Sequence, residues 1–438
     1  MKKKSEAFYR FWQDMANGPL SYYDPDEIED AVCDLLDLNL TDEASTLVRH
    51  GLSLHPGNAT IEYWAIWIGL HTSHVEEAEK MFEKYKGSDD SAALRLKFTF
   101  QLLHGHPRIA LQDFTTALRE GKVPPADWVN TIEELFDALP NVVLIPFMTE
   151  AAELIKDDAE SLSRISAILI DTGQFEQAAP ILERSLDLNA YDIYSWQDLA
   201  RCYMLMHDKD KCMEACEYGL AIEADNPLLS FIRGYMLYDQ SHYADCIPYL
   251  LNARRFAEGK IGARNLNMSD AEIQQQINIT YELLGLAYME TEQNEQAKEC
   301  FDILTERDPS NIQGYMHLAS IFLLEGDQNT ALNFINQAYS LNPHDESVCS
   351  LRISVLTSMH RFDEVIDSLR AAIKLFPRKR TYLIAYAEIL RQTDHKQEAD
   401  TVYRKLLKMR VREKAYRQIM RDYFESIGDN EALEQLKD

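Results

Sequence analysis

The sequence predicts an all-α fold, an α-solenoid in which pairs of helices repeat along the chain. Residues 278–311 and 312–345 have equal lengths and the same pattern of large and small residues, which sets a period of 34 residues. Apolar residues in both segments follow the 3.6-residue helical period. Only 16 Gly and 14 Pro occur in 438 residues, too few for a loop-rich β fold. One helix pair cannot bury its apolar face alone, so the pairs are expected to stack.

The packing residues of a repeat can be identified in 278–311. Gly285 and Ala297 stand at positions 8 and 20 of this segment, where small residues let two helix backbones approach closely. The aromatic ring of Phe301, at position 24, is expected to fill the space beside them. Pro309 ends the second helix because proline cannot donate the next helical hydrogen bond.

This combination of small, aromatic and proline residues resembles the tetratricopeptide repeat family. Residues 193–226 also fit the family pattern closely, with Trp196, Leu199, Ala200 and Tyr203 in place. The resemblance implies a right-handed superhelix of helix pairs, whose concave groove binds a protein or peptide partner.

Carrying the register along the chain predicts about eleven repeats. Seven occupy residues 25–260 and four occupy 278–413, with an insertion at 261–277 between them. The repeat ranges are 25–58, 59–90, 91–124, 125–158, 159–192, 193–226, 227–260, 278–311, 312–345, 346–379 and 380–413. Repeats 59–90 and 125–158 depart most from the pattern, and Pro146 is expected to mark a late helix start.

Both ends of the chain are predicted to cap the solenoid. Residues 1–24 hold a short helix from Ser5 to Ala16 and a linker, and residues 414–438 hold terminal helices. Capping is favoured because a stack of repeats exposes apolar surface at each end. The alternative for the first helix is an amphipathic membrane contact, since Lys2 to Lys4 precede its apolar face.

The insertion at 261–277 is the clearest break in the register. Ser269-Asp270-Ala271-Glu272 forms a capping box, so the following helix is expected to begin there and to be longer than the others. Insertions that interrupt a regular scaffold often contain functional residues. Basic residues nearby make the insertion a candidate partner-contacting loop, with a passive insertion as the alternative. These candidates are Arg254, Arg255, Lys260 and Arg264.

The charge of the chain is large, negative and uneven. The formal net charge of −28 argues against general binding to nucleic acid or anionic membranes. It is expected to keep a long apolar stack soluble, with an acidic groove for basic partners as the alternative. Residues 374–421 hold 14 Lys and Arg against 5 Asp and Glu, a net of +9, which leaves −37 elsewhere. A solvated helix face explains this asymmetry most simply; the alternatives are an acidic partner or head-to-tail self-association.

The sequence predicts a cytoplasmic protein without a membrane span. Its basic N-terminus lacks the apolar run of a signal peptide, and no later stretch approaches about 18 apolar residues. Seven irregularly spaced cysteines fit a reducing compartment.

The resemblance also selects candidate groove residues. In tetratricopeptide repeats, positions 2, 5, 6, 9, 12 and 13, mostly of the first helix, face the groove. Aromatic, Arg and Asn side chains there suit a peptide, because they bury much area and satisfy a peptide backbone. The candidates are Tyr63, Trp64, Trp67, Arg95, Asn130, Arg164, Gln197, Arg201, Phe231, Tyr235, Tyr238 and His317.

Motifs for catalysis or metal binding are weak. The segment Gly259-Lys260-Ile261-Gly262 lacks the spacing of a phosphate-binding loop. Cys212 and Cys216 stand at packing positions 20 and 24, so core filling is favoured over a metal site. We therefore predict no catalytic residue, no metal and no cofactor.

These features predict a non-catalytic scaffold or adaptor that binds a protein or peptide segment in the groove. The alternative is a regulatory receptor for a small ligand or short signalling peptide, enclosed by the superhelix with residues 261–277 as a lid. An enzyme built from scattered groove residues is a third class. The sequence leaves the partner and the oligomeric state open.

Overall fold

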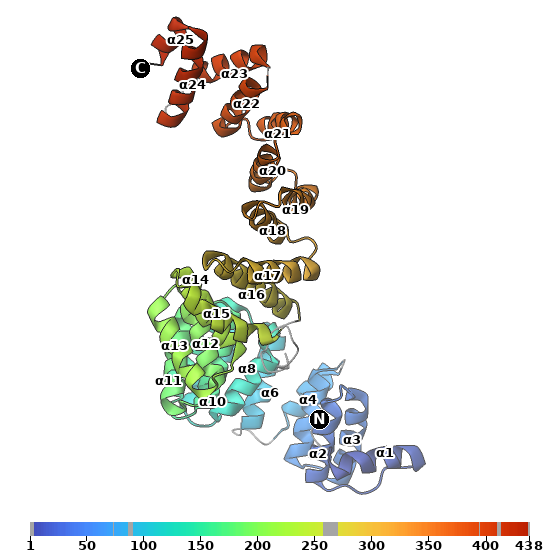
Figure 1. Cartoon of the computed structure of the whole chain (residues 1–438). Helices are drawn as coiled ribbons and strands as arrows, with labels where there is room; N and C mark the ends of the chain where they lie inside the picture. The colour runs from blue at the N-terminus through green and yellow to red at the C-terminus, as the bar shows by residue number, and fades with distance from the viewer. Residues whose placement is uncertain are drawn as a thin grey trace. The chain divides into compact units, whose positions relative to one another are not determined.

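The computed structural model describes residues 4–72, 74–85, 91–256, 270–393, 395–409 and 413–436. Within these ranges the chain is helical, with 25 α-helices and two short 3₁₀-helices and no strand. The all-α prediction is therefore confirmed. The chain divides into two compact units, residues 1–224 and 225–438, and each is described by itself. In Figure 1 the helices of each unit follow one another in chain order, and neighbours along the chain pack together as in a solenoid.

The first unit begins with α1 and ends with α13. Its helices are α1 (Glu6–Asn17), α2 (Pro25–Leu36), α3 (Thr41–Leu54), α4 (Ala59–Leu70), α5 (Val75–Phe82), α6 (Ser91–Leu103), α7 (Pro107–Arg119), α8 (Pro125–Glu134), η1 (Phe136–Ala138), α9 (Asn141–Leu154), α10 (Ala159–Asp171), α11 (Phe175–Leu188), α12 (Ile193–Leu205) and α13 (Lys209–Ile222). Phe8 and Phe11 of α1 are buried in one cluster with Ile28, Leu35 and Leu47 of α2 and α3. Such burial suits a helix that covers the end of a stack.

The second unit continues the pattern from α14 to α25. Its helices are α14 (Pro227–Asp239), α15 (Tyr243–Ala253), η2 (Arg254–Phe256), α16 (Asp270–Glu290), α17 (Asn294–Arg307), α18 (Ile312–Leu324), α19 (Gln328–Leu341), α20 (Glu346–Ser358), α21 (Phe362–Leu375), α22 (Arg380–Gln392), α23 (Lys396–Lys408), α24 (Lys414–Ile427) and α25 (Asn430–Gln435). As the sequence predicts, α16 is the long helix, with 21 residues. The division of the chain into eleven repeats stays a prediction.

Asparagine and aspartate side chains fix where many first helices of a pair begin. Each accepts a hydrogen bond from a backbone N–H in the first turn, which satisfies a donor that has no helical partner. These N-caps are Asn58 on α4, Asp158 on α10, Asp192 on α12, Asn226 on α14, Asn311 on α18 and Asp345 on α20. Every one of them is the last residue of a predicted repeat, so the period of the sequence is also the period of helix starts.

Close approach of paired helices depends on glycine at position 8. A Cβ on Gly285 of α16 would lie 2.6 Å from Cζ of Phe301 on α17. In α14, a Cβ on Gly234 would lie 2.8 Å from the side chain of Leu250 on α15. Both contacts join position 8 to position 24, and 2.6–2.8 Å is too short for two carbons. A larger residue in place of either glycine would therefore push the two helices apart.

The expected late helix start at Pro146 is wrong. The helix α9 begins at Asn141 and contains Pro146 in its interior. Pro180 and Pro248 occupy the same place in α11 and α15, and all three prolines are exposed. Proline removes the hydrogen bond to the carbonyl four residues earlier, which for Pro146 belongs to Val142. Because Val142 is 88% exposed, water can hydrate that carbonyl and the helix continues.

Candidate partner-binding surface

All twelve predicted groove residues lie on first helices of the predicted pairs. In the first unit they are Tyr63, Trp64 and Trp67 on α4, Arg95 on α6, Asn130 on α8, Arg164 on α10, and Gln197 and Arg201 on α12. In the second unit they are Phe231, Tyr235 and Tyr238 on α14 and His317 on α18.

Three successive first helices of the first unit are joined by charged contacts centred on α8. Arg95 of α6 forms an ion pair with Glu134, and Arg164 of α10 forms one with Glu133. The guanidinium of Arg164 also donates to Oδ1 of Asn130 over 2.6 Å. The carboxylate of Glu133 raises the pKa of Arg164, which remains a cation. We call these five residues, Arg95, Asn130, Glu133, Glu134 and Arg164, the polar strip.

Aromatic side chains of α4 lie next to the polar strip. Burial raises the pKa of Tyr63 to about 12, and the charges of Arg95 and Glu134 act on the same phenol. The rings of Trp64 and Trp67 meet edge to face at 5.8 Å, and Trp67 stacks on His71 at 4.0 Å. Both indoles are half-buried and pack against two hydrophobic clusters, so they support the fold as well as the surface.

Two predicted groove residues are buried, which corrects their assignment. Tyr63 is 9% exposed and packs in one cluster with Leu96 and Phe100 of the next first helix, α6. Gln197 is 6% exposed on α12. Position 5 of a repeat can point between two first helices instead of outward, and the 3.6-residue period alone does not distinguish these directions. Neither side chain presents a surface that a partner could cover.

Arg201 is half-buried on α12 and forms an ion pair with Asp198 at 3.1 Å. Burial raises the pKa of Asp198, while the nearby guanidinium opposes this effect. Arg201 therefore already has an anionic neighbour, and a partner would have to compete with it.

The candidates of the second unit form one aromatic group and one separate residue. Phe231 and Tyr235 stack on α14 with ring centroids 6.4 Å apart, and Tyr235 is 37% exposed. Tyr238, one turn further along α14, meets the ring of Tyr243 edge to face at 5.3 Å. His317 lies on α18, where its ring stacks on Phe301 at 4.8 Å and joins the packing of α17 and α18.

The burial of His317 predicts a pH dependence of stability. Burial lowers the pKa of His317 below its usual value near 6.5, so the folded state disfavours its protonation relative to the unfolded state. The stability from the neutral ring is complete above pH 6.5 and decreases as the pH falls below it. We expect His317→Phe, which keeps a ring on Phe301, to lose less stability than the wild type between about pH 7.5 and pH 5.

Urea unfolding of both proteins at each pH measures this difference, and an NMR titration of the His317 ring measures the pKa directly. A pKa at or above 6.5, or equal losses of stability in the two proteins, would contradict the prediction.

Two of the four basic candidates beside the insertion lie within the described residues. Arg255 of η2 forms an ion pair with Asp225 at 2.7 Å and donates to Oδ1 of Asn252 over 3.2 Å. Arg254 lies in the same short helix and is half-buried. Lys260 and Arg264 lie outside the described residues. Of the predicted loop contacts, the structure thus places only the two arginines that precede the insertion.

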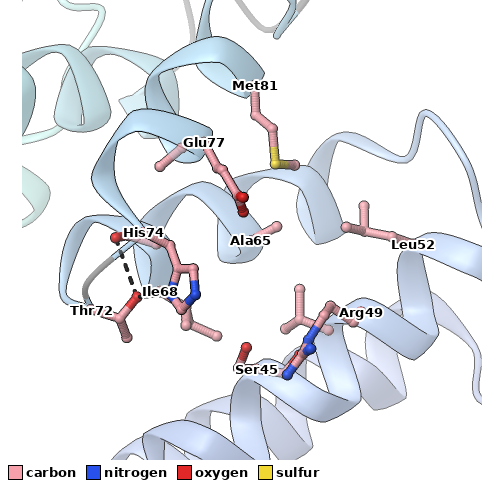
Figure 2. A pocket seen from close by; sticks show the side chains of 12 residues that line it. Ser45, Arg49, Leu52, Ala65, Ile68, Thr72, His74, Glu77 and Met81 are labelled. Carbon is pink, nitrogen blue, oxygen red and sulfur yellow. Dashed lines mark hydrogen bonds between the residues drawn. The ribbon is translucent and has the colours of Figure 1, made fainter.

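A cavity of about 180 Å³ lies in the first unit between α3, α4 and α5. Val48, Leu52, Ile68 and Met81 give it apolar walls. Figure 2 shows Arg49 and Glu77 on opposite sides of it, contributed by α3 and α5. The cavity uses residues of α4 other than Trp64 and Trp67, so it is separate from the predicted groove residues.

Sequence reasoning missed the acidic members of this surface. Glu133 stands at position 9 of its repeat and Asp198 at position 6, which are both groove positions. Selecting only aromatic, Arg, Asn, Gln and His residues excluded them, although an arginine at a groove position favours an anionic partner. The sequence contains a weaker signal for the cavity. Repeat 59–90 is two residues shorter than the 34-residue period, and its second helix, α5, is short.

The described ranges contain neither a metal-binding cluster nor a helix suited to span a membrane. No group of three or more His, Cys, Asp or Glu side chains there is arranged to hold a metal ion. None of the described helices combines the length and the hydropathy that crossing a membrane requires.

Solved structures similar to this chain include several repeat proteins. YrrB, titled a TPR protein with an unusual peptide-binding site, has 19% identity and a TM-score of 0.38 over 46% of this chain and 95% of its own. Pseudomonas aeruginosa pilF has 18% identity and a TM-score of 0.40 over 52% and 97%. The APC/C hetero-tetramer Cut9-Hcn1 has 11% identity and a TM-score of 0.36 over 95% and 92%. At these values we draw no conclusion from them.

Family models give the informative match. Two models described as tetratricopeptide repeat match residues 169–230 and 283–346. A search of curated protein sequences finds no match. The matched residues contain α12 and α18, which start after N-caps at the ends of predicted repeats. Residues 169–230 and 283–346 of this chain are therefore tetratricopeptide repeats.

Proposed function

We propose that the chain is a non-catalytic scaffold or adaptor that binds a segment of another protein along the first helices of its repeats. The observation that carries this proposal is the polar strip, in which charged and amide side chains of α6, α8 and α10 form one connected surface. Its residues are half-buried or exposed, so they remain within reach of a partner.

The chemistry of the polar strip suits an extended peptide. Packed helix axes lie about 8–10 Å apart and an extended chain advances about 3.3 Å per residue, so one helix spacing corresponds to about three residues. Arginine, asparagine and glutamate can donate to carbonyl groups, accept from N–H groups and pair with charged side chains. The side chains of the polar strip are already held in place by their contacts with one another. They therefore lose little conformational entropy when a partner binds them.

Aromatic side chains would supply the apolar contribution to binding. Tyr235 is the most exposed of the aromatic candidates, and its ring is held in place by Phe231. Rigid aromatic anchors of this kind contribute much of the binding energy in protein interfaces. We propose Tyr235 as an anchor in the second unit, and Trp64 and Trp67 as secondary contacts because they also support the fold.

The cytoplasm is the proposed location. All seven cysteines are free thiols, which suits a reducing compartment.

Site-specific crosslinking can test this function. A photoreactive phenylalanine derivative would replace Asn130 on α8 or Tyr235 on α14. The matched controls carry it at exposed positions on the second helices of the same repeats, Thr149 on α9 and Asp245 on α15. After irradiation in the source cells, we expect the first-helix variants to crosslink to a protein absent from the controls. Mass spectrometry would identify the bound segment.

A synthetic peptide with that segment should bind the wild-type chain in calorimetry and bind Tyr235→Ala more weakly than Asp245→Ala. Equal crosslinking at all four positions would overturn the proposed surface. Crosslinking to no protein, together with thermal stabilisation by a small-molecule extract, would favour the receptor for a small ligand instead.

A further inference from the structure

One edge of the second unit carries a row of basic residues. Residues 374–380, from the last turn of α21 to the first residue of α22, include four Lys or Arg and no Asp or Glu. Lys405 and Lys408 lie in the last turn of α23, and Lys414 is the first residue of α24. These positions belong to two successive connections between a second helix and the next first helix, so they meet at the same edge of the stack.

Ion pairs establish that the successive connections are neighbours. Lys379, the N-cap of α22, lies 2.5 Å from Glu346 at the start of α20. Arg380, the first residue of α22, lies 3.3 Å from Glu413, the N-cap of α24. The starts of α20, α22 and α24 therefore lie in a row, and the basic residues beside them lie along this edge of the unit.

Five cations at this edge have no ion pair among the described residues. Lys374, Arg378, Lys405, Lys408 and Lys414 are all exposed, and we call them the basic edge. In the preceding part of this unit Arg255, also beside the end of a second helix, has the anionic partner Asp225. A row of unpaired cations on a chain with a net charge of −28 is not explained by solubility, because the surrounding acidic surface already provides it.

The first unit carries a surface of the opposite charge. Residues 24–43 include nine Asp or Glu and no Lys or Arg. Asp26, Glu29 and Asp30 share one exposed face of α2, since residues three and four apart are neighbours on a helix. Together with Asp42 at the start of α3, they have no ion pair among the described residues and we call them the acidic face.

Carboxylates around Cys33 on α2 affect the pKa of its thiol. The pKa of Cys33 is raised to about 11, first by burial and then by Glu29, Asp37, Asp30 and Asp34. Glu29 and Asp30 of the acidic face therefore act on one thiol together, whereas Asp34 and Asp37 form ion pairs with Lys4.

We propose that the basic edge of one copy of this chain binds the acidic face of a second copy. A second copy satisfies both surfaces, whereas another acidic molecule would cover the basic edge and leave the acidic face unmatched. Each copy would offer one surface of each kind, so the contact is heterologous and further copies can add. This association is separate from the proposed binding of a peptide on the first helices.

Ionic strength should control the association in a specific way. Copies with a net charge of −28 repel each other at long range, while the two matched surfaces attract at contact. At an ionic strength of about 0.1 M the Debye length is about 10 Å, which screens distant charges and leaves touching charges effective. At about 1 M it is about 3 Å, and the contact itself is weakened.

Sedimentation velocity of the full chain tests the proposal. We expect the weight-average sedimentation coefficient to rise with protein concentration at about 0.1 M salt and to become independent of concentration at about 1 M. A wild-type chain that stays monomeric at about 0.1 M salt up to the highest soluble concentration would overturn the proposal.

Charge reversal then identifies the surfaces. Arg378→Glu with Lys414→Glu reverses the basic edge, and Glu29→Lys with Asp30→Lys reverses the acidic face. Each double variant alone should remain monomeric. Their mixture should associate, because the reversed edge of one matches the reversed face of the other. Association that persists in either variant alone, or a mixture that does not associate, would contradict the proposed contact.

Arg49→Glu with Lys84→Glu is the matched control. It changes the net charge by as much as the edge variant, at exposed cations of the first unit that have no ion pair among the described residues. We expect this control to associate like the wild type. Circular dichroism of every variant confirms that it is folded, so that loss of association can be assigned to charge.

Discussion

Phe301→Ala is expected to lower the free energy of unfolding by about 3–5 kcal/mol. Phe301 is fully buried, with its ring against Gly285 on one side and the ring of His317 on the other. It therefore joins α16, α17 and α18, and its loss leaves a cavity between two consecutive pairs. Gly285, which faces the ring of Phe301, has no side chain that could fill this cavity. Urea unfolding followed by circular dichroism would measure the change, and hydrogen exchange would locate it.

The expected location distinguishes this effect from general weakening. In a solenoid each repeat contacts only its neighbours, so exchange should increase most in α16 to α19 and least in the first unit. Phe301→Leu is the control, because it retains most of the buried apolar volume and should lose clearly less stability. A loss below about 1 kcal/mol for Phe301→Ala would mean that the helices close over the cavity.

Trp128→Ala is expected to have an effect of similar size, about 3–5 kcal/mol, in the first unit. Trp128 is fully buried on α8 and stacks on Phe114 of α7 with ring centroids 6.5 Å apart. The same helix carries Asn130, Glu133 and Glu134 of the polar strip. Loss of the indole should therefore also weaken the ion pairs that α8 makes with α6 and α10. Thermal and urea unfolding would measure the first effect.

Trp128→Phe distinguishes the contribution of the buried ring from that of the indole N–H. The indole N–H of Trp128 is buried without a hydrogen-bond partner among the described residues, and an unpaired buried donor costs about 1–3 kcal/mol. Phenylalanine removes this donor and keeps an aromatic ring, so its loss of stability should be well below that of alanine. Equal losses for the two variants would indicate that the N–H has a partner, such as a buried water.

Much of the fold could be predicted from the sequence because its determinants are local and periodic. The spacing of Gly285 and Phe301 predicted a close helix pair, and in the structure a Cβ on Gly285 would lie only 2.6 Å from the ring of Phe301. The capping box at Ser269 to Glu272 predicted a long helix, and α16 has 21 residues from Asp270 onward. In a solenoid every repeat packs mainly on its sequence neighbours, so a short window of sequence contains most of the relevant contacts.

The candidate surface was less predictable because it depends on which way each side chain turns. The sequence placed Tyr63 and Asn130 at neighbouring groove positions, yet Tyr63 is buried against α6 and Asn130 accepts a hydrogen bond from Arg164. Glu133 and Glu134 belong to the polar strip only through their ion pairs with Arg164 of α10 and Arg95 of α6, which the sequence does not show. A rotation of a helix by a fraction of a turn exchanges buried and exposed positions without changing the period.

The sequence by itself therefore determined the all-α solenoid, its 34-residue period and the helix starts, because hydrophobic spacing, small residues and N-caps act within one repeat. Only the tertiary structure decided which cations are paired and which are free. Arg380 at the start of α22 and Glu413 at the start of α24 are 33 residues apart and form an ion pair, while Arg378 beside Arg380 has no ion pair among the described residues. Pairing of charges requires contact between repeats, and composition alone contains no distances.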